Sequence, residues 1–360
     1  MFDKLEQCYK GKKVFLTGHT GFKGAWLLKV LSLLGAQVRG YALETQTEND
    51  LFNLINGRQI CESIISDLRD KDALNTAVEE FQPDFIFHLA AQPLVRLSYE
   101  IPSETFEVNA IGTANLLDAV RKLQKACSIV LITTDKVYHN YEWEYSYREN
   151  DRLGGYDPYS ASKACAELVI DSYINSFFNI NKFEIHKKAI AIGRAGNVIG
   201  GGDWSKDRLI PDIAKALFKD EEIIVRNPNS VRPWQHVLEP VVAYLSLGEK
   251  LSHNPVEISQ AYNFGPYHSD ALPVSEMLNL AIKNWGKGSY KVQKTENQPH
   301  EAGLLKLDIS KAIKYLDWEP RWNAQIAVEK SISWYKCFYS HKETVNDFTE
   351  QQINDFFKSK

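Results

Sequence analysis

The sequence contains few cysteines, and their spacing indicates no shared role. Cys8, Cys61, Cys127, Cys165 and Cys337 are odd in number, lie far apart and form no C-x-x-C pair. Regularly spaced pairs are what mark a disulfide framework or a zinc site in a sequence. We therefore expect reduced thiols with packing roles and no metal site.

The sequence also lacks a strong charge excess, a long apolar run and a leader segment. Its 42 Lys and Arg nearly balance 46 Asp and Glu, and no basic stripe offers a surface to nucleic acid. No stretch approaches the ~18 uninterrupted apolar residues of a membrane span. The start M-F-D-K-L-E-Q lacks the charged-then-apolar pattern of a signal peptide. These absences predict a cytoplasmic protein with neither nucleic acid nor a membrane as partner.

Short apolar runs alternate with amphipathic segments along the first half of the chain. With 360 residues, 44% of them hydrophobic, the chain can bury a full core. The expected strands are 14–17, 37–43, 63–65, 84–88, 129–134 and 188–192, and the expected helices are 22–34, 71–81, 104–124 and 159–178. Helices between successive strands imply crossover connections. The predicted fold class is α/β, a Rossmann-type doubly wound parallel sheet.

Beyond Arg194 the composition changes to glycine-rich loops and tryptophans, as in G-N-V-I-G-G-G-D-W and V-R-P-W-Q-H. This change predicts a smaller C-terminal substrate-binding lobe. The run A-Y-N-F-G is typical of a strand that could return to the sheet. We assign 1–195, rejoined by about 241–266, to the Rossmann domain, 196–240 and 267–345 to the lobe, and 346–360 to a tail that is a surface helix or a frayed end.

A glycine turn between the first strand and its helix predicts a dinucleotide site. Gly18, Gly21 and Gly24 in T-G-H-T-G-F-K-G allow a tight turn and a close approach of the backbone to a pyrophosphate. The three-and-three spacing differs from the commonest fingerprint, so a plain glycine turn is the alternative. Asp67 could accept a hydrogen bond from an adenine amine, or cap a helix. H-L-A-A-Q supplies small residues where a flat cofactor must pass, or simply ends a strand.

The motifs I-T-T-D-K-V-Y and P-Y-S-A-S-K predict alcohol oxidation. Tyr159 and Lys163 are four residues apart on a helix and share one face. A nearby ammonium favours phenolate, so Tyr159 could take a hydroxyl proton while hydride leaves the same carbon. Thr134 could hydrogen-bond that oxygen. Asp135 and Lys136 add ionisable groups that simple oxidation does not require; the alternative is a solvated pair at a strand end.

Taken in order, these motifs resemble the extended short-chain dehydrogenase/reductase family from Val14 to about Trp322. The resemblance implies that Lys163 holds the cofactor ribose and that Asn109 supports the active-site helix. It favours NAD over NADP, because Glu44 could replace the usual acidic residue after the second strand and no arginine pair follows it. The implied cofactor-binding residues are Gly18, Thr20, Gly21, Phe22, Gly24, Asp67, Leu68, Leu89, Ala90, Ala91, Asn109, Thr133, Tyr159 and Lys163.

T-D-K-V-Y, together with V-R-P-W-Q-H-V-L-E-P, is similar to the bacterial CDP-glucose 4,6-dehydratases, whereas the dTDP-glucose enzymes carry glutamate in place of Lys136. The resemblance implies oxidation at C4, loss of water across C5 and C6, and hydride return to C6. Asp135 would be the acid at the C6 oxygen and Lys136 the base at C5, which requires Lys136 to be neutral. For CDP-glucose it implies contacts from Asn197 and Arg232, with Arg208 as a weaker candidate.

Other readings remain open at this point. A nucleotide-sugar 4-epimerase needs the tyrosine and lysine but no acid–base pair, and inverting UDP-N-acetylglucosamine dehydratases replace Tyr159 by methionine. A silent NAD-binding scaffold would not need Thr134, Tyr159 and Lys163 intact. The nucleotide base rests on the resemblance alone. The apolar faces of 104–124 and 159–178 could form the interface of a homodimer or homotetramer, or pack on the sheet.

Overall fold

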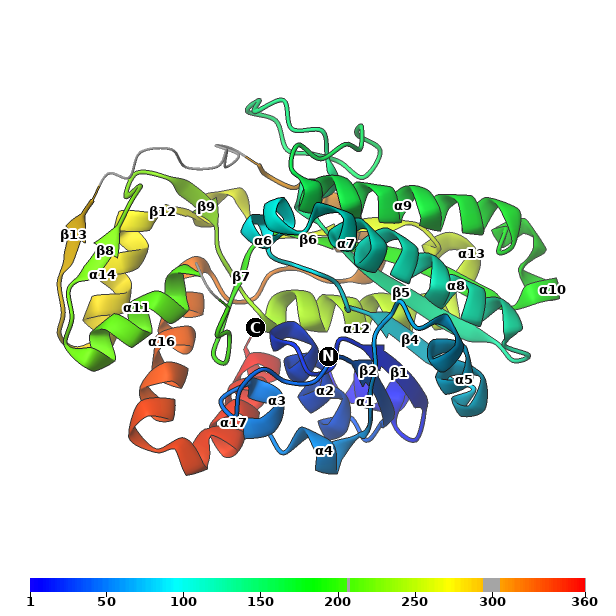
Figure 1. The fold of residues 1–360 in the computed structure, drawn as a ribbon, viewed down its shortest axis with the longest axis horizontal. Helices are drawn as coiled ribbons and strands as arrows, with labels where there is room; N and C mark the ends of the chain where they lie inside the picture. The colour runs from blue at the N-terminus through cyan, green and yellow to red at the C-terminus, as the bar shows by residue number, and fades with distance from the viewer. Residues whose placement is uncertain (206–207, 294–304, 360) are drawn as a thin grey trace.

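Seven parallel strands form the centre of the molecule (Figure 1). The computed structural model describes residues 1–205, 208–293 and 305–359. The strands lie in the order β11-β6-β5-β4-β1-β2-β3. Their bounds are β1 (Lys13–Thr17), β2 (Gln37–Ala42), β3 (Glu62–Ile65), β4 (Phe85–His88), β5 (Cys127–Thr134), β6 (Lys188–Ala195) and β11 (Ala261–Phe264). The predicted doubly wound sheet is confirmed. The order in which successive strands are added to the sheet reverses between β1 and β4, and such sheets bind ligands at this point.

Helices cover both faces of this sheet. One face carries α5 (Lys71–Phe81), α8 (Gly112–Lys122) and α9 (Pro158–Ser176), and the other carries α1 (Phe2–Tyr9), α2 (Phe22–Leu33) and α12 (Leu238–His253). Every residue of β5 is buried, as expected for a strand covered on both sides. The strand β11 pairs in parallel with β6, as predicted for a segment that returns to the sheet.

The helix expected over 104–124 is interrupted. Its path consists of α7 (Pro102–Phe106), a π-helical turn η1 (Glu107–Ile111) and α8. The prediction of one regular α-helix is therefore wrong at η1. The wider turn places Asn109 in the interior, where its side chain meets α9 and the loop after β4. Such turns recur at functional sites.

A smaller lobe lies beside the open end of the sheet, at the left of Figure 1. It contains two short strand pairs, β8 with β13 and β9 with β12. Its elements are α11 (Leu209–Lys219), β8 (Ile223–Val225), β9 (Val231–Pro233), β12 (Ala271–Pro273), α14 (Val274–Trp285), β13 (Tyr290–Val292) and α16 (Ala324–Ser340). The remaining short elements are α3 (Leu51–Leu54), α4 (Gly57–Ile60), α6 (Val95–Glu100), α10 (Phe183–His186), α13 (Pro255–Ile258), α15 (Ser310–Leu316), β7 (Val198–Ile199) and β10 (Gln235–His236).

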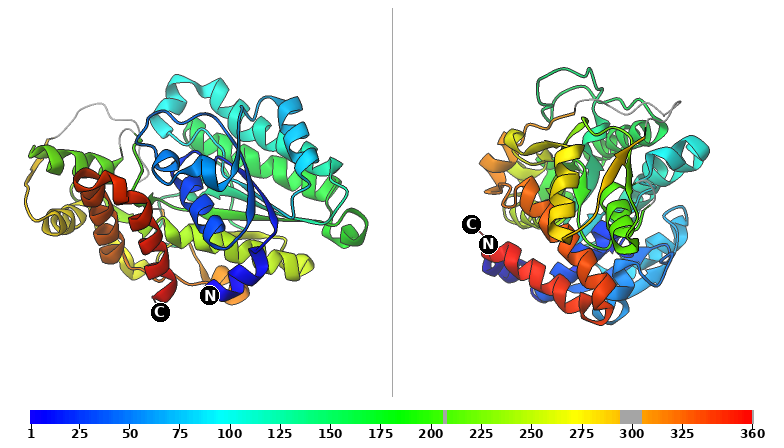
Figure 2. Two further views of the ribbon diagram at one scale, coloured as in Figure 1. Left: turned by 90° about the horizontal axis from the view of Figure 1, so that it is seen from below. Right: turned by 90° about the vertical axis from the view of Figure 1, so that its left-hand side faces the viewer.

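The C-terminal segment forms the helix α17 (Val345–Lys358), which packs against the body of the protein. Phe357 meets Phe2 with ring centroids 5.1 Å apart, and Glu350 pairs with Lys29 at 3.1 Å. The views in Figure 2 accordingly place the two termini near each other. Of the two alternatives for this tail, the frayed end is wrong: apolar residues recur at helical spacing and give the segment a face to bury.

Two further observations concern the length of the helices and the state of the cysteines. Within the described ranges, no helix is both long and apolar enough to cross a bilayer. All five cysteines lie within those ranges and are free thiols.

A buried carboxyl joins the helix α12 to the segment that precedes α16. Glu239, on α12, accepts hydrogen bonds from the backbone N–H groups of Arg321 and Trp322 at 3.0 and 2.7 Å. Burial raises the pKa of Glu239 to about 8, and these two hydrogen bonds oppose the shift. The carboxyl is therefore largely neutral at physiological pH.

Glu239 should give the stability of the protein a definite pH dependence. Between its ordinary pKa of 4.5 and its folded value of about 8, the folded protein binds more protons than the unfolded chain. The free energy of unfolding should therefore fall as pH rises through this window. Glu239→Gln, which keeps the accepting oxygen but cannot ionise, should lose this part of the dependence in urea unfolding.

The exposed Glu329 on α16 provides the control. Glu329→Gln should leave the pH dependence of unfolding as it is in the wild type. Parallel stability curves for the wild type and Glu239→Gln across the window would contradict the assignment of a neutral buried carboxyl.

Candidate active site

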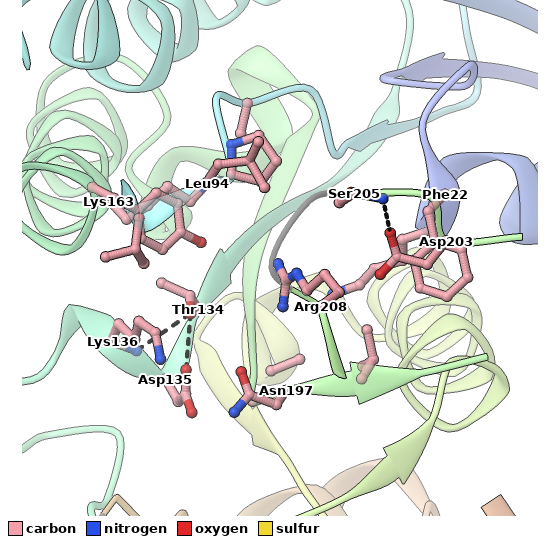
Figure 3. A pocket seen from close by; sticks show the side chains of 18 of the residues that line it. Phe22, Leu94, Thr134, Asp135, Lys136, Lys163, Asn197, Asp203, Ser205 and Arg208 are labelled. Carbon is pink, nitrogen blue, oxygen red and sulfur yellow. Dashed lines mark hydrogen bonds between the residues drawn. The ribbon is translucent and has the colours of Figure 1, made fainter. Parts of the chain in front are cut away.

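One cavity of about 1890 Å³ gathers most of the predicted site residues. It lies at the carboxyl ends of the central strands and is lined from both the sheet and the smaller lobe. Its walls include all five residues predicted for catalysis, namely Thr134, Asp135, Lys136, Tyr159 and Lys163. The predicted cofactor residues also line it, except Asn109. Figure 3 shows the catalytic end of this cavity.

The glycine turn between β1 and α2 is packed so closely that two of its glycines are required by the chain itself. Gly18 has a φ of 77°, and a Cβ there would lie 2.7 Å from the Ala90 nitrogen. A Cβ on Gly24 would lie 1.9 Å from the Gly18 oxygen. A Cβ on Gly21 would meet only the Gly18 oxygen, at 3.4 Å, so protein contacts alone do not require glycine there. The turn thus forms an open cradle at the N-terminus of α2, where phosphate groups are attracted.

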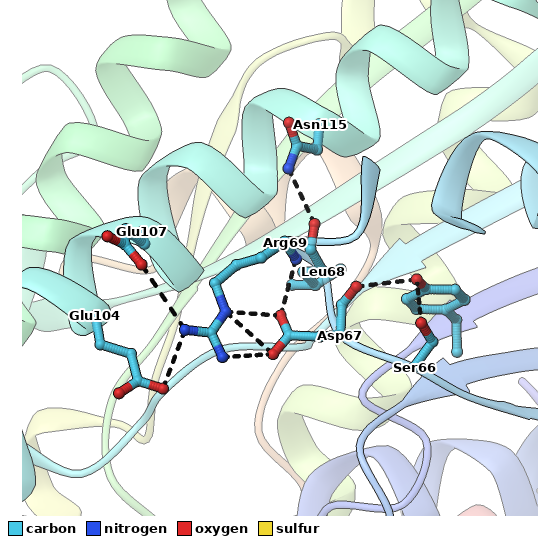
Figure 4. A network of polar contacts seen from close by, with 8 residues as sticks. Ser66, Asp67, Leu68, Arg69, Glu104, Glu107 and Asn115 are labelled. Carbon is cyan, nitrogen blue, oxygen red and sulfur yellow. Dashed lines mark hydrogen bonds and ion pairs between the residues drawn. The ribbon is translucent and has the colours of Figure 1, made fainter. Parts of the chain in front are cut away.

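The far end of the cavity holds a network of charges around Arg69 (Figure 4). Its guanidinium donates to Asp67 at 2.7 Å and pairs with Glu104 and Glu107 at 3.2 and 3.7 Å. The hydrogen bond from Arg69 lowers the pKa of Asp67. The helix-cap alternative for Asp67 is wrong, because Asp70 caps α5 by accepting from the Ala73 N–H. Asp67 and Leu68 remain candidates for adenine contacts at this end.

Glu44 lies just after β2 and also lines the cavity. Its carboxylate pairs with Arg58 at 2.6 Å, and both side chains are about half exposed. The nearby Thr20 hydroxyl donates to the Leu43 oxygen at 2.8 Å and fixes the segment against the glycine turn. The prediction that Glu44 replaces the usual ribose-binding acid stays a prediction.

The start of α9 is fixed by local contacts that aim Tyr159 into the cavity. Pro158 occupies the first turn and Asp157 caps it by accepting from the Ser160 N–H at 3.0 Å. The Tyr159 N–H donates to the Ser98 hydroxyl at 3.1 Å. The position of the phenol is thus set by both α9 and α6.

The ionisation of Tyr159 differs from what Lys163 alone would suggest. Burial raises the pKa of Tyr159 to about 12, and a hydrogen-bonding contact with the Thr134 hydroxyl acts in the opposite direction. Burial lowers the pKa of Lys163 to about 8, with Glu167 opposing, and its ammonium donates to the Ile132 oxygen at 3.0 Å. The expectation that a neighbouring lysine favours phenolate is therefore wrong for the protein alone, because the cost of burying a charge is larger.

Thr134, Asp135 and Lys136 follow the end of β5 on one short turn. The Thr134 hydroxyl donates to Asp135 Oδ1 at 2.9 Å, and the Lys136 N–H donates to Thr134 Oγ1 at 3.3 Å (Figure 3). A Cβ on Gly196 would lie 3.2 Å from Asp135 Oδ2, so the glycine leaves room for this carboxylate. The sequence neighbours are thereby held as one polar cluster at the cavity wall.

Two predicted residues support the site through contacts with other side chains. Asn109 accepts from the Gln92 N–H at 2.8 Å and donates to the Ser162 hydroxyl at 2.8 Å, which joins the loop after β4 to α9. Thr133 lines the cavity, but its hydroxyl donates to Glu167 at 2.6 Å. Glu167 also binds Arg194 through two oxygens in a fully buried ion pair.

Sequence reasoning missed Glu167 and Lys23. Glu167 lies one turn after Lys163 on the same face of α9, a spacing that could have indicated it. Lys23, within G-F-K-G, lines the cavity, and its ammonium lies 3.4 Å from the Tyr244 hydroxyl. Burial lowers the pKa of Lys23 to about 8; Arg208 and Lys163 add to the shift and Asp135 opposes it. Its position within the glycine-rich turn G-F-K-G could have indicated that Lys23 lies near the predicted site.

The structure describes the side chains of two of the three residues predicted to bind the substrate. Asn197 follows β6 and Arg208 precedes α11, and both line the cavity, with the Arg208 guanidinium directed into it (Figure 3). Arg232 lies in β9 opposite Leu272, but its side chain is outside the described part of the structure. The stretch 298–301 also lies outside the described residues. No group of residues in the described ranges could hold a metal ion.

Comparison with known proteins gives independent findings. The family model described as GDP-mannose 4,6 dehydratase matches residues 15–331. The CDP-glucose 4,6-dehydratase of Salmonella typhimurium is 45% identical over 359 residues, covering 100% of this chain and 99% of that protein.

Two solved structures share the fold. A dTDP-glucose 4,6-dehydratase from Streptomyces venezuelae with NAD bound has a TM-score of 0.76 and 21% identity, covering 90% of this chain and 97% of its own. A UDP-glucose 4-epimerase from Thermotoga maritima has a TM-score of 0.75 and 18% identity, covering 90% and 98%. At these identities the two structures bear on the fold alone.

The glycine turn allows folding and cofactor binding to be tested separately. Gly24→Ala should destabilise the protein, since its Cβ would overlap the Gly18 oxygen and overpacking costs about 1–3 kcal/mol or more. Gly21→Ala should keep wild-type stability but weaken NAD binding by about tenfold, or about 1.4 kcal/mol, because its Cβ would face the phosphates. Thermal melting and titration with NAD measure the two effects. Wild-type NAD affinity in Gly21→Ala would refute the role of Gly21.

Proposed function

The chain belongs to the GDP-mannose 4,6 dehydratase family, within the extended short-chain dehydrogenases/reductases, and from this we propose that it converts CDP-glucose to CDP-4-keto-6-deoxyglucose and water. The observation that carries the proposal is the 45% identity over the full chain to a CDP-glucose 4,6-dehydratase. The presence of Asp135 and Lys136 in the same cavity as Tyr159 supports it. The enzyme is an NAD-dependent hydro-lyase.

The glycine cradle fits the cofactor. Gly18 and Gly24 allow the close turn, and Gly21 leaves the backbone open toward a pyrophosphate. NAD supplies, when bound, a reversible acceptor for the hydride that leaves C4 and returns at C6. Lys163, buried beside the end of β5, would hold the ribose, and Asn109 would keep the nearby loop and α9 in register.

The first step assigns the C4 hydroxyl to Tyr159 and Thr134. Tyr159 receives the hydroxyl proton while the carbon becomes a ketone, and Thr134 contacts the Tyr159 phenol that takes this proton. The ketone acidifies the proton on C5. Burial of both residues at the cavity wall, at 9% and 7% exposure, removes competing water from the reacting oxygen.

The second step assigns the elimination to Asp135 and Lys136. Lys136, as the neutral amine, removes the C5 proton, and Asp135, as the acid, protonates the departing C6 hydroxyl. Lys136 then returns a proton to C5 when hydride reaches C6. Their adjacent positions on one turn after β5 support this division, since C5 and its substituent C6 are bonded neighbours.

The diphosphate of the substrate is assigned to Asn197, Arg208 and Arg232. Arg208 gains support from its position, because its guanidinium points into the cavity and offers charge-assisted hydrogen bonds. The cytidine base follows from the identity to the Salmonella enzyme rather than from any base-reading side chain. A 4,6-dehydratase for another nucleotide sugar is the near alternative.

A nucleotide-sugar 4-epimerase is the second candidate, because such enzymes are built on the same fold. A UDP-glucose 4-epimerase shares the fold at a TM-score of 0.75. That reaction needs Tyr159 and Lys163 but has no use for an acid and a base beside them. Asp135 and Lys136 therefore favour dehydration.

We also propose that the enzyme acts in the cytoplasm, as a homodimer or homotetramer, in deoxysugar steps of lipopolysaccharide biosynthesis. Exposed apolar side chains along η1 and α9 support an interface: Ile111 is 54% exposed, Leu168 62% and Phe177 44%. The division into a Rossmann domain and a substrate lobe, with the bounds given above, is likewise a proposal.

The fate of the C4 hydrogen tests the proposed function. CDP-glucose carrying deuterium at C4 should give CDP-4-keto-6-deoxyglucose with deuterium at C6 and no net consumption of NAD. NMR and mass spectrometry of the product measure this transfer. Deuterium found again at C4 in a galactose-configured product would establish epimerisation instead.

Exchange at C5 tests the roles of Asp135 and Lys136. Lys136→Met should still oxidise C4, so enzyme-bound NADH should accumulate in a single turnover while elimination stalls. Asp135→Asn should also stall elimination but retain some deuterium wash-in at C5, because the base is present. Almost no wash-in is expected for Lys136→Met. Equal wash-in in the two variants would overturn this division of roles.

A further inference from the structure

The proposed reaction moves one proton between two oxygens of the sugar. The C4 hydroxyl loses a proton with the hydride, and the C6 hydroxyl gains a proton and leaves as water. The C5 proton is removed and returned, so it cancels. In each turnover Tyr159 therefore gains one proton and Asp135 loses one, and both groups must return to their starting state. This accounting rests on the proposed function.

The structure places a single hydroxyl between these two groups. Thr134 Oγ1 donates to Asp135 Oδ1 at 2.9 Å, and the same hydroxyl is in hydrogen-bonding contact with the Tyr159 phenol. The Lys136 N–H occupies one side of this oxygen at 3.3 Å. Thr134, Asp135 and Tyr159 are all buried at the cavity wall, at 7%, 4% and 9% exposure, so bulk water has little access to them.

We propose that the Thr134 hydroxyl relays the C4 proton from Tyr159 to Asp135. As the C4 O–H bond breaks, its proton bonds to the Tyr159 oxygen, and the phenol proton bonds to Thr134 Oγ1. The Thr134 proton then bonds to Asp135 Oδ1. Tyr159 and Thr134 end as they began, neutral, and the Asp135 carboxylate becomes a carboxylic acid. The electron pair of the C4–H bond leaves as hydride to NAD.

The elimination then uses the proton that the oxidation delivered. The carboxylic acid O–H of Asp135 breaks as its proton bonds to the C6 oxygen, and the C6–O bond breaks to release water. The electrons of the C5–H bond form the C5–C6 double bond while Lys136 takes the C5 proton. Asp135 returns to its carboxylate form, ready for the next turnover, and the proton on the C6 oxygen is not drawn from solvent.

The charges around the relay are consistent with this direction. Burial raises the pKa of Tyr159 to about 12, so the relay starts from a neutral phenol and needs no free phenolate. Asp135 and Asp157 also raise this pKa, while the Thr134 contact and Arg208 lower it. Lys23 on α2 and Lys163 on α9 are the other cations of the cluster, and the charge of Lys23 interacts favourably with Asp135.

Infrared spectroscopy of a stalled enzyme tests the relay. In Lys136→Met, mixing with CDP-glucose should accumulate NADH and should also produce the C=O stretching band of a protonated carboxyl. Labelling aspartate with carbon-13 should shift this band and leave that of the sugar ketone in place. The band should be absent in the double variant Asp135→Asn, Lys136→Met, and NADH formation in that variant should be slowed by about 10²-fold.

Thr134 variants supply the matched comparison on the same Lys136→Met background. Thr134→Val keeps the shape but removes the hydroxyl, and it should slow NADH formation by about 10²-fold and abolish the carboxyl band. Thr134→Ser should restore both. A carboxyl band of normal size in Thr134→Val, or unslowed NADH formation in the Asp135→Asn double variant, would overturn the relay.

These outcomes separate the relay from the proposed function. If the wild type makes no 4-keto-6-deoxy product from CDP-glucose, the proposed function itself fails. If product forms and NADH accumulates in Lys136→Met, but the carboxyl band does not depend on Thr134, the function stands and only the relay is refuted.

Discussion

The buried ion pair between Glu167 and Arg194 is the interaction on which the site depends. Arg194, in β6, donates to both oxygens of Glu167 on α9, and a further nitrogen donates to the Tyr138 hydroxyl at 2.7 Å. Thr133 of β5 donates to the same carboxylate. Removing one partner of such a pair costs about 3–5 kcal/mol, because the other charge is left buried and unpaired. Two strands, the active-site helix and the loop after β5 are therefore held in one arrangement.

Burial decides the electrostatics of the cavity more than neighbouring charges do. It lowers the pKa of Lys23 and of Lys163 to about 8 and raises that of Tyr159 to about 12. Each shift favours the neutral form, so the two lysines become able to exchange protons near neutral pH, whereas Tyr159 stays a neutral phenol there. The Arg208 guanidinium is directed into the same cavity, where its fork of donors suits an anionic diphosphate.

The sequence predicted the features that depend on the spacing of residues and on the order of the elements. It missed the features that depend on burial and on contacts between residues far apart in the chain. Tyr159 and Lys163 share a helix face, and parallel strands end at one edge, so their meeting with Asp135 could be foreseen. The π turn around Asn109 could not, because it leaves no mark in the spacing of apolar residues. The raised pKa of Tyr159 could not be predicted either, because its largest cause is burial, and the residues adjacent in the sequence do not show how deeply the side chain is buried.

The position of the acid and base directly after Thr134 follows from the chemistry. An acid elsewhere on the cavity rim could protonate the C6 oxygen, but it would have to recover its proton from solvent in each turnover. Asp135 lies instead one residue from the threonine that contacts Tyr159, and the hydroxyl of Thr134 reaches it at 2.9 Å. In the proposed reaction, a single oxygen thus joins the group that oxidation protonates to the group that elimination deprotonates. Placing both functions on one turn after β5 would suit a scaffold shared with epimerases to dehydration.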